Sequence, residues 1–339
     1  MTETLVSYSL IAIYSAMAIY TLAFVMFAVD VARRSVESSD AAADATGLSA
    51  SSARRTGIIE AASADSPYAT TTTTLIGDDS SSADGKPVRP SSPKYLRLAM
   101  AMTVIAWLLH VSAVVLRGVA ANRVPWANMF EFTLTATAII VGVFLLVQFW
   151  QDLRFLGSFI TGFSLIALGV GTSSFYVDVV PLPPALQSVW LVIHVFVASL
   201  STGVFALAAG LSIVQLMQAR RESGKALKLR FLDTLPAAER LETLAYRLTV
   251  VGFVMWTFTL IAGAVWAERA WGRYWGWDTK EVWTFIIWTI YAGYIHARAT
   301  RGWRGSRSAW LAIVGFTAIV FNFTIVNLFF KGLHAYSGL

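Results

Sequence analysis

The sequence contains no cysteine, and this absence excludes several kinds of site. Without a thiolate, the chain cannot by itself ligate an iron–sulfur cluster, build a zinc–thiolate site or use a catalytic cysteine. Histidine is then the strongest soft-metal ligand that remains, apart from methionine. The chain has four histidines, which are His110, His194, His296 and His334.

Charge is also scarce. Charged residues make up 14% of the chain and hydrophobic residues 56%, whereas soluble domains carry roughly 25% charged residues. A membrane core about 30 Å thick needs roughly 20 apolar residues of helix. The sequence therefore predicts an all-α, polytopic membrane helix bundle of about eight transmembrane helices, over residues 5–29, 96–116, 129–150, 155–175, 187–217, 248–267, 282–299 and 309–330.

The distribution of Lys and Arg predicts the orientation of these helices. The first residues, MTET, carry no positive charge, so residues 1–30 are expected to be a retained helix rather than a secretory signal. With the N-terminus outside, 20 of the 26 Lys and Arg residues fall in cytoplasmic segments, as the positive-inside rule requires. We therefore expect an extracytoplasmic N-terminus in a cell membrane.

The remaining segments divide the chain into regions. Residues 31–94 are rich in Ser, Ala, Thr, Asp and Gly, and this composition predicts a disordered cytoplasmic linker. Residues 95–339 are expected to form one transmembrane domain. The net charge of +6 is spread over several loops, so no basic face for nucleic acid is predicted.

The predicted spans place the histidines at two levels. His194 lies about seven residues inside its span, and His334 follows the last span, so both belong to the outer level. His296 lies deeper, nearer the cytoplasm. Two imidazoles can ligate one haem iron from opposite faces when a neighbour orients the second nitrogen of each ring. Alternatively, His194 forms only an interhelical hydrogen bond and His334 is an ordinary loop residue.

Residues 266–283 contain an unusual density of aromatic side chains at the outer level. Tryptophan and tyrosine favour any membrane interface, but an aromatic belt does not require Gly272 and Gly276 or the acid Asp278. The two glycines allow a flat partner or another backbone to approach, and Asp278 can orient an imidazole. Arg269, Arg273 and Lys280 could pair with the propionates of a haem. The aromatic residues of this segment include Trp266, Trp271, Tyr274, Trp275, Trp277 and Trp283.

The stretch WGRYWGWDTKEVW, residues 271–283, resembles the WWD signature of haem-handling cytochrome c biogenesis proteins. Four further stretches are similar to the CcsA (ResC) branch of that family: PWANMFEF at 125–132, LQSVWLVIHV at 186–195, YAGYIHAR at 291–298 and GLHAYSG at 332–338. The resemblance covers roughly residues 95–338. Thr279 departs from it, since many relatives carry proline after the aspartate.

This resemblance implies a subunit of a system II cytochrome c synthase, or haem lyase. Haem b would be both substrate and ligand: it would reach the outer face, be held there by His194 and His334 against the WWD segment, and be joined to the CxxCH motif of an apocytochrome c. His296 would be the ligand of an inner haem, with the second ligand supplied by a ResB/CcsB-like membrane protein. The resemblance thus implies that the chain acts with a partner.

Other interpretations remain open. A b-type electron-transfer protein would also use histidine pairs, although the inner level offers one histidine only. A secondary transporter of an anionic aromatic solute would explain the aromatic and basic residues without the histidines. His110 is either a further ligand or an interhelical hydrogen bond. Asn128 and Glu131 either cap a helix or contact the WWD segment or the apocytochrome.

Overall fold

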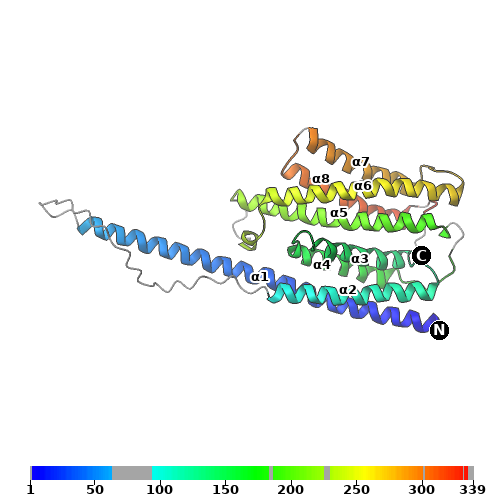
Figure 1. The fold of residues 1–339 in the computed structure, drawn as a ribbon, viewed down its shortest axis with the longest axis horizontal. Coiled ribbons are helices and arrows are strands. Elements are labelled where there is room, and N and C mark those ends of the chain that lie inside the picture. Colours follow the sequence, from blue (N-terminus) through cyan, green and yellow to red (C-terminus); the bar gives the residue numbers. More distant parts are fainter. Residues whose placement is uncertain are drawn as a thin grey trace.

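The computed structural model describes residues 2–62, 94–182, 186–224, 230–300, 302–330 and 332–334. The described residues form helices and turns and no strand, which confirms the all-α prediction. Residues 63–93 of the predicted linker lie outside the described residues. The helices pack lengthwise beside one another (Figure 1), and their bounds are α1 Thr2–Ala62, α2 Lys94–Ala121, α3 Met129–Val147, α4 Gly157–Ser174, α5 Val189–Glu222, α6 Ala238–Trp271, α7 Thr279–Thr300, α8 Ser306–Phe323 and α9 Ile325–Phe329, with short 3₁₀ turns η1 Arg154–Leu156 and η3 Arg230–Thr234.

Seven segments within the described residues are long and apolar enough to cross a membrane. The eighth predicted span, 282–299, corresponds to α7, which has 22 residues and is long enough by geometry. It is less apolar because its ends carry Lys280, Glu281, His296 and Arg298. Since α7 joins the end of α6 to the start of α8, it still runs from one end of the bundle to the other (Figure 1).

The first helix extends much further than the sequence analysis predicts. Disorder is expected from residue 31, but α1 continues to Ala62 and leaves the bundle as a single long helix (Figure 1). Over residues 31–62 the structure thus has a helix where the sequence predicts a linker. This stretch contains no proline and several alanines, and alanine is the residue with the highest helix propensity, so low hydrophobicity alone does not break the helix.

Close contacts between small and aromatic residues hold the central helices together. The rings of Phe205 on α5 and Tyr291 on α7 stack with centroids 3.8 Å apart. A Cβ added at Gly252 of α6 would lie 2.8 Å from the Phe205 ring, and one added at Gly315 of α8 would lie 2.7 Å from Tyr291. The two glycines thus provide the space in which both rings are buried, as small residues do between membrane helices.

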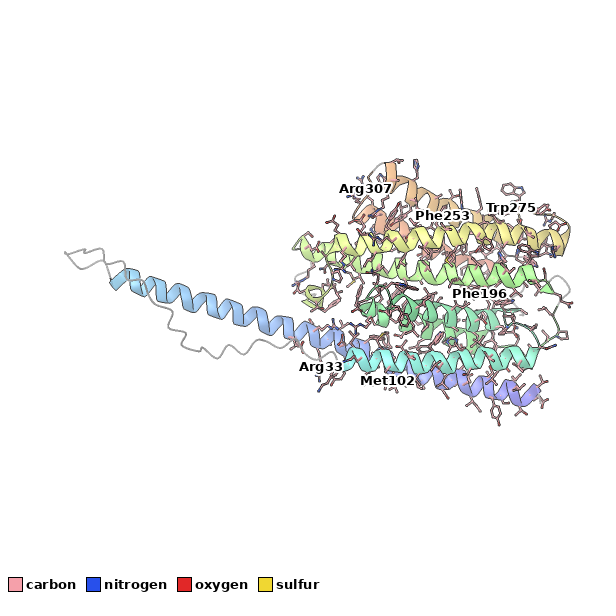
Figure 2. All side chains as sticks on the ribbon, in the orientation of Figure 1. Arg33, Met102, Phe196, Phe253, Trp275 and Arg307 are labelled. Carbon is pink, nitrogen blue, oxygen red and sulfur yellow. The ribbon has the colours of Figure 1, made fainter. Side chains whose placement is uncertain are left out.

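A buried carboxylate ties α6, α7 and α8 together at one end of the bundle. Glu242 pairs with Arg298 and accepts hydrogen bonds from the Gly305 N–H, at 2.9 Å, and the Ser308 hydroxyl, at 3.2 Å. The candidate site described below lies at the opposite end. Figure 2 shows this separation, with Arg33 and Arg307 at one end of the bundle and Trp275 at the other.

Candidate functional site

A cavity of about 430 Å³ opens between α3, α4, α5, α6, α7 and α8, and both outer-level histidines line it. Most of its wall is apolar, with side chains such as Phe132, Ile140 and Val320. A few polar groups interrupt this surface, a composition typical of sites for small organic ligands. The polar and aromatic residues of the wall include Asn128, His194, Trp266, Tyr274, Trp275, Lys280, Glu281, Asn322 and His334.

His194 is held in a fixed orientation by the neighbouring helix. It lies in the second turn of α5, and its Nδ1 is 2.9 Å from the backbone carbonyl oxygen of Thr259 on α6. Because a carbonyl only accepts hydrogen bonds, Nδ1 carries the proton. A Cβ added at Gly263, one turn further along α6, would lie 2.7 Å from the imidazole Cε1. Gly263 therefore leaves the space that the ring needs.

His334 is oriented by a carboxylate of the WWD segment. Its Nδ1 donates to Asp278 Oδ2 over 2.7 Å, and the neighbouring Leu333 N–H donates to Asp278 Oδ1 over 3.1 Å. Gly332 leaves room for this approach, because a Cβ there would collide with the carboxylate. The hydrogen bond from His334 is the largest cause that holds the pKa of Asp278 below its ordinary value of 3.8.

The two imidazoles thus share one arrangement. In each ring Nδ1 donates to an oxygen, and Nε2 makes no hydrogen bond within the described part of the chain. A neutral imidazole whose Nδ1–H is bound to an oxygen offers the Nε2 lone pair to a metal, and such an oxygen partner is what usually orients histidine ligands. The cavity therefore has two histidines prepared for metal ligation.

Trp266 places the two histidines on one aromatic surface. Its ring lies nearly parallel to that of His194, with centroids 6.0 Å apart, and meets His334 edge-on at 5.4 Å. Trp271 contacts both Trp266 and His334, each at 4.8 Å between centroids. His334 thus contacts two indoles. Trp266 is the ring that contacts both histidines, a role that the sequence alone does not distinguish from those of the neighbouring tryptophans.

The two glycines of the WWD segment have different structural roles. Gly272 ends α6 in the left-handed conformation, with φ +70°, and its N–H donates to the Glu268 carbonyl, a position where glycine is favoured. At Gly276, an added Cβ would collide with the guanidinium of Arg273. The sequence predicts a flat partner or another backbone in this space, but the Arg273 side chain occupies it.

Glu281 fixes the turn that leads into α7. One of its carboxylate oxygens accepts from the N–H groups of Gly276, at 2.8 Å, and Asp278, at 2.9 Å. The Asp278 carbonyl accepts from Val282 and so begins the helix. In many helices, a glutamate three residues after the N-cap residue accepts a hydrogen bond from the backbone N–H of that N-cap residue in this way. This leaves the Asp278 side chain available for His334.

The other tryptophans of the segment differ in their positions. Trp275 lines the cavity and meets Trp277 edge-on at 5.9 Å. Trp277 has a φ of +59° and is 73% exposed, so it points away from the cavity wall. Trp283 packs on Phe321 of α8, with centroids 4.4 Å apart, inside the helix bundle. Of the WWD tryptophans, Trp275 and Trp266 form part of the wall.

The two remaining histidines lie away from the cavity. His110 is fully buried between helices: Nε2 is 2.8 Å from the Leu134 carbonyl oxygen and Nδ1 is 3.4 Å from the Tyr20 hydroxyl. Both ring nitrogens are therefore engaged, which supports the interhelical hydrogen bond rather than a ligand role. His296 is exposed on the face of α7 that points away from the helix bundle.

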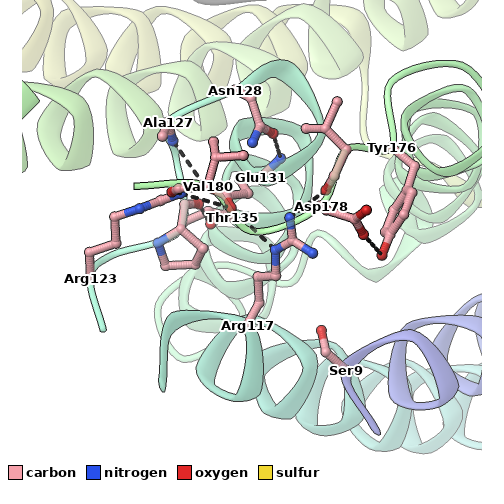
Figure 3. A network of polar contacts seen from close by, with 12 residues as sticks. Ser9, Arg117, Arg123, Ala127, Asn128, Glu131, Thr135, Tyr176, Asp178 and Val180 are labelled. Carbon is pink, nitrogen blue, oxygen red and sulfur yellow. Dashed lines mark hydrogen bonds and ion pairs between the residues drawn. The ribbon is translucent and has the colours of Figure 1, made fainter. Parts of the chain in front are cut away.

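Asn128 and Glu131 belong to a buried polar network beside the cavity. Asn128 caps α3, with its Oδ1 accepting from the Glu131 N–H at 2.9 Å. The Glu131 carboxylate accepts from Arg117, at 3.2 Å, and Arg123, at 2.6 Å, as Figure 3 shows. Arg117 also donates to the Val177 carbonyl at 2.6 Å. The network thus joins the loop before α3 and the loop after α4 to the part of the cavity wall that carries Asn128.

Comparison with known proteins agrees with this geometry. The family model described as "Cytochrome C assembly protein" matches residues 95–334. The chain belongs to this family. The match includes every element of the cavity and both of its histidines, so membership gives the chain a role in cytochrome c maturation and confirms the resemblance seen in the sequence.

Individual relatives support the same assignment. The chain is 34% identical to a "Cytochrome c biogenesis protein CcsA" of Guillardia theta, over 70% of this chain and 84% of the relative. It is 35% identical to the protein of that name from Synechococcus sp. (strain CC9902), over 73% and 88% respectively. The solved structure "Cytochrome c Heme Lyase CcmF" shares the fold, with a TM-score of 0.53 and 17% identity, over 69% of this chain and 41% of that one.

Proposed function

We propose that this cytochrome c assembly protein holds haem b in the cavity, with His194 and His334 as axial ligands of the iron. The observation that carries the proposal is that both rings donate from Nδ1, and so keep Nε2 free, within one apolar cavity that they share with Trp266. Iron held by two imidazoles needs both Nε2 lone pairs. A flat, largely apolar macrocycle fits a wall of indole and aliphatic side chains.

The bound haem is the substrate of a covalent attachment reaction. Each cysteine of the CxxCH motif in an apocytochrome c adds its thiol across one haem vinyl group. A carbon–sulfur bond forms at the vinyl carbon next to the macrocycle, and the thiol proton ends on the terminal carbon, so no electron is gained or lost. The chain's contribution is to hold the macrocycle still and dry, because positioning lowers the barrier of a reaction between two bound partners.

We further propose that the cavity end is extracytoplasmic and that haem arrives from the other side through His296. An exposed imidazole within a membrane span requires a partner outside the chain, because lipid offers no hydrogen bond. Thr289 and Gly293 lie on the same exposed face of α7, and small residues of this kind let another helix approach. A ResB/CcsB-like protein would supply that helix and the second ligand of an inner haem.

Single and double replacements of the two cavity histidines test this function. In the full chain purified from a membrane, His194→Gly and His334→Gly are expected to lose the haem absorption spectrum, and added imidazole is expected to restore it. Imidazole added to the unaltered chain should leave the spectrum unchanged. Haem content that survives in the double variant would contradict the proposal and would favour transport of another anionic aromatic solute. If the unaltered chain shows the spectrum of a haem with two histidine ligands but transfers no haem to an apocytochrome, electron transfer is favoured instead.

A further inference from the structure

One cation in the cavity wall is attracted by a neighbouring carboxylate, that of Asp278, but makes no direct contact with an acid within the described residues. Lys280, in the first turn of α7, lines the cavity, and its ammonium makes no hydrogen bond or ion pair in that part of the chain. Of the two acids beside it in the chain, Asp278 binds His334 and Leu333. Glu281 binds two backbone N–H groups through Oε2, while its buried Oε1 has no hydrogen-bond partner in the described residues and forms no ion pair with Lys280. A charge beside an apolar surface is costly unless it is paired. The ammonium therefore favours an anionic group on the occupant of the cavity.

The other cations of this segment do not compete for that group. The guanidinium of Arg269 lies over the Trp190 ring, 5.9 Å from its centroid, and that of Arg273 folds over Gly276. Neither residue contributes to the cavity wall. Of the three cations that the sequence analysis considers for the propionates, Lys280 is the one that the geometry leaves facing the cavity.

A neutral donor lies on the α3 side of the same cavity. Asn128 is 5% exposed, and because its Oδ1 caps α3, its amide group Nδ2 remains as a buried donor without a partner in the described structure. A buried donor that is left unpaired costs free energy. Lys280 and Asn128 thus provide two unused donors in one wall.

We propose that Lys280 binds a carboxylate group of the macrocycle, with the amide of Asn128 as a second donor to the same polar edge. This inference rests on the proposed function, because it takes haem as the occupant, and it specifies which chemical feature of haem is recognised. The positive end of the α7 helix dipole lies at the same place and adds to the attraction for an anion. Binding of the carboxylate edge at Lys280 would also fix which edge of the macrocycle carries its vinyl groups toward the apocytochrome.

Comparison of haem with its dimethyl ester tests the inference, because the ester keeps the iron and the ring but removes both carboxylate charges. The full chain, stripped of haem in detergent, is titrated with each compound and binding is followed by absorption. We expect the unaltered chain to bind haem about tenfold or more tightly than the ester, the magnitude of one charge-assisted hydrogen bond. Lys280→Met should bind the ester as before and lose this preference, whereas Lys280→Arg should retain most of it.

Two controls separate the possible outcomes. Arg307→Met removes the same charge at the opposite end of the bundle and should keep the full preference for haem. Asn128→Asp removes the amide donor and adds a negative charge, so it should reduce the preference for haem over the ester. Equal binding of both compounds by the unaltered chain, or an undiminished preference in Lys280→Met, would overturn the inference while leaving haem binding intact. Binding of neither compound would contradict the proposed function itself, and the inference with it.

Discussion

Asp278 and His334, which are 56 residues apart in the sequence, form a hydrogen bond of 2.7 Å that joins the WWD segment to the end of the described chain. Asp278 lies immediately before α7, and His334 follows the last helix, so the bond brings two chain segments to one edge of the cavity. The same carboxylate binds the Leu333 N–H. Asp278 therefore acts as a positioning residue for the His334 ring.

Replacing Asp278 with alanine should weaken haem binding without removing either histidine. The ring of His334 would lose the acceptor that selects its Nδ1–H tautomer, and loss of such an oriented partner typically costs about 10–100-fold in metal affinity. Asp278→Asn, which keeps an acceptor oxygen but no charge, should give a smaller loss. Titration with haem, together with imidazole rescue, measures both effects. An affinity in Asp278→Ala equal to that of the unaltered chain would show that His334 does not depend on this carboxylate.

The Asp278 contact also predicts a pH dependence. Its pKa in the folded chain is lowered below 3.8, first by the hydrogen bond from His334. A carboxylate with a depressed folded-state pKa contributes stability that is complete above its unfolded value and disappears as the pH falls through the folded value. Thermal unfolding in detergent should therefore show that Asp278→Asn differs from the unaltered chain at pH 5 and above, and that the difference shrinks below about pH 3.8. A difference that grows at lower pH would contradict this assignment.

The sequence predicts the residues of this site better than the contacts between them. Histidines at 194 and 334 and an acid at 278 are visible as rare polar groups beside membrane spans, because lipid makes such residues conspicuous. Gly263 and Gly332 carry no comparable signal, since each is one glycine among 23. Their importance depends on which side chain from a distant segment occupies the space above them, and this is known only when the helices are packed.

The same limit explains two interpretations that the structure changes. Gly276 is predicted to admit a flat partner or another backbone, but the Arg273 guanidinium fills that space, a local contact between residues three apart. The linker prediction for residues 31–62 uses low hydrophobicity as its criterion, and α1 shows that helix propensity continues the chain past the membrane span. In both cases the structure is set by an effect between residues close in the sequence. The prediction instead assigns the residues a role that depends on distant parts of the molecule or on overall composition.

Gly263 offers a test of how closely His194 is held. A methyl group at this position would lie 2.7 Å from the imidazole Cε1, so Gly263→Ala must displace the ring from the Thr259 carbonyl. The variant should lose haem as His194→Gly does, with partial recovery in imidazole. Gly169→Ala on α4 is a matched control, because a Cβ there meets nothing within 4 Å. That control should bind haem normally and unfold at the same temperature or slightly higher, since alanine is favoured over glycine inside a helix.

The buried network around Glu131 should contribute more to stability than any other ion pair of the cavity end. Glu131 is fully buried, Arg117 is 1% exposed, and both Arg117 and Arg123 depend on the same carboxylate. Glu131→Gln leaves two guanidinium groups without a counter-ion, and breaking a buried pair in this way costs about 3–5 kcal/mol. Equilibrium or thermal unfolding in detergent measures the loss. The exposed pair of Arg154 with Asp152, at the start of the span that contains α4, provides the comparison: Asp152→Asn should cost less than about 1 kcal/mol. If the two variants lose similar stability, the network does not support the loops beside the cavity, and Asn128 must be held in place by the α3 cap alone.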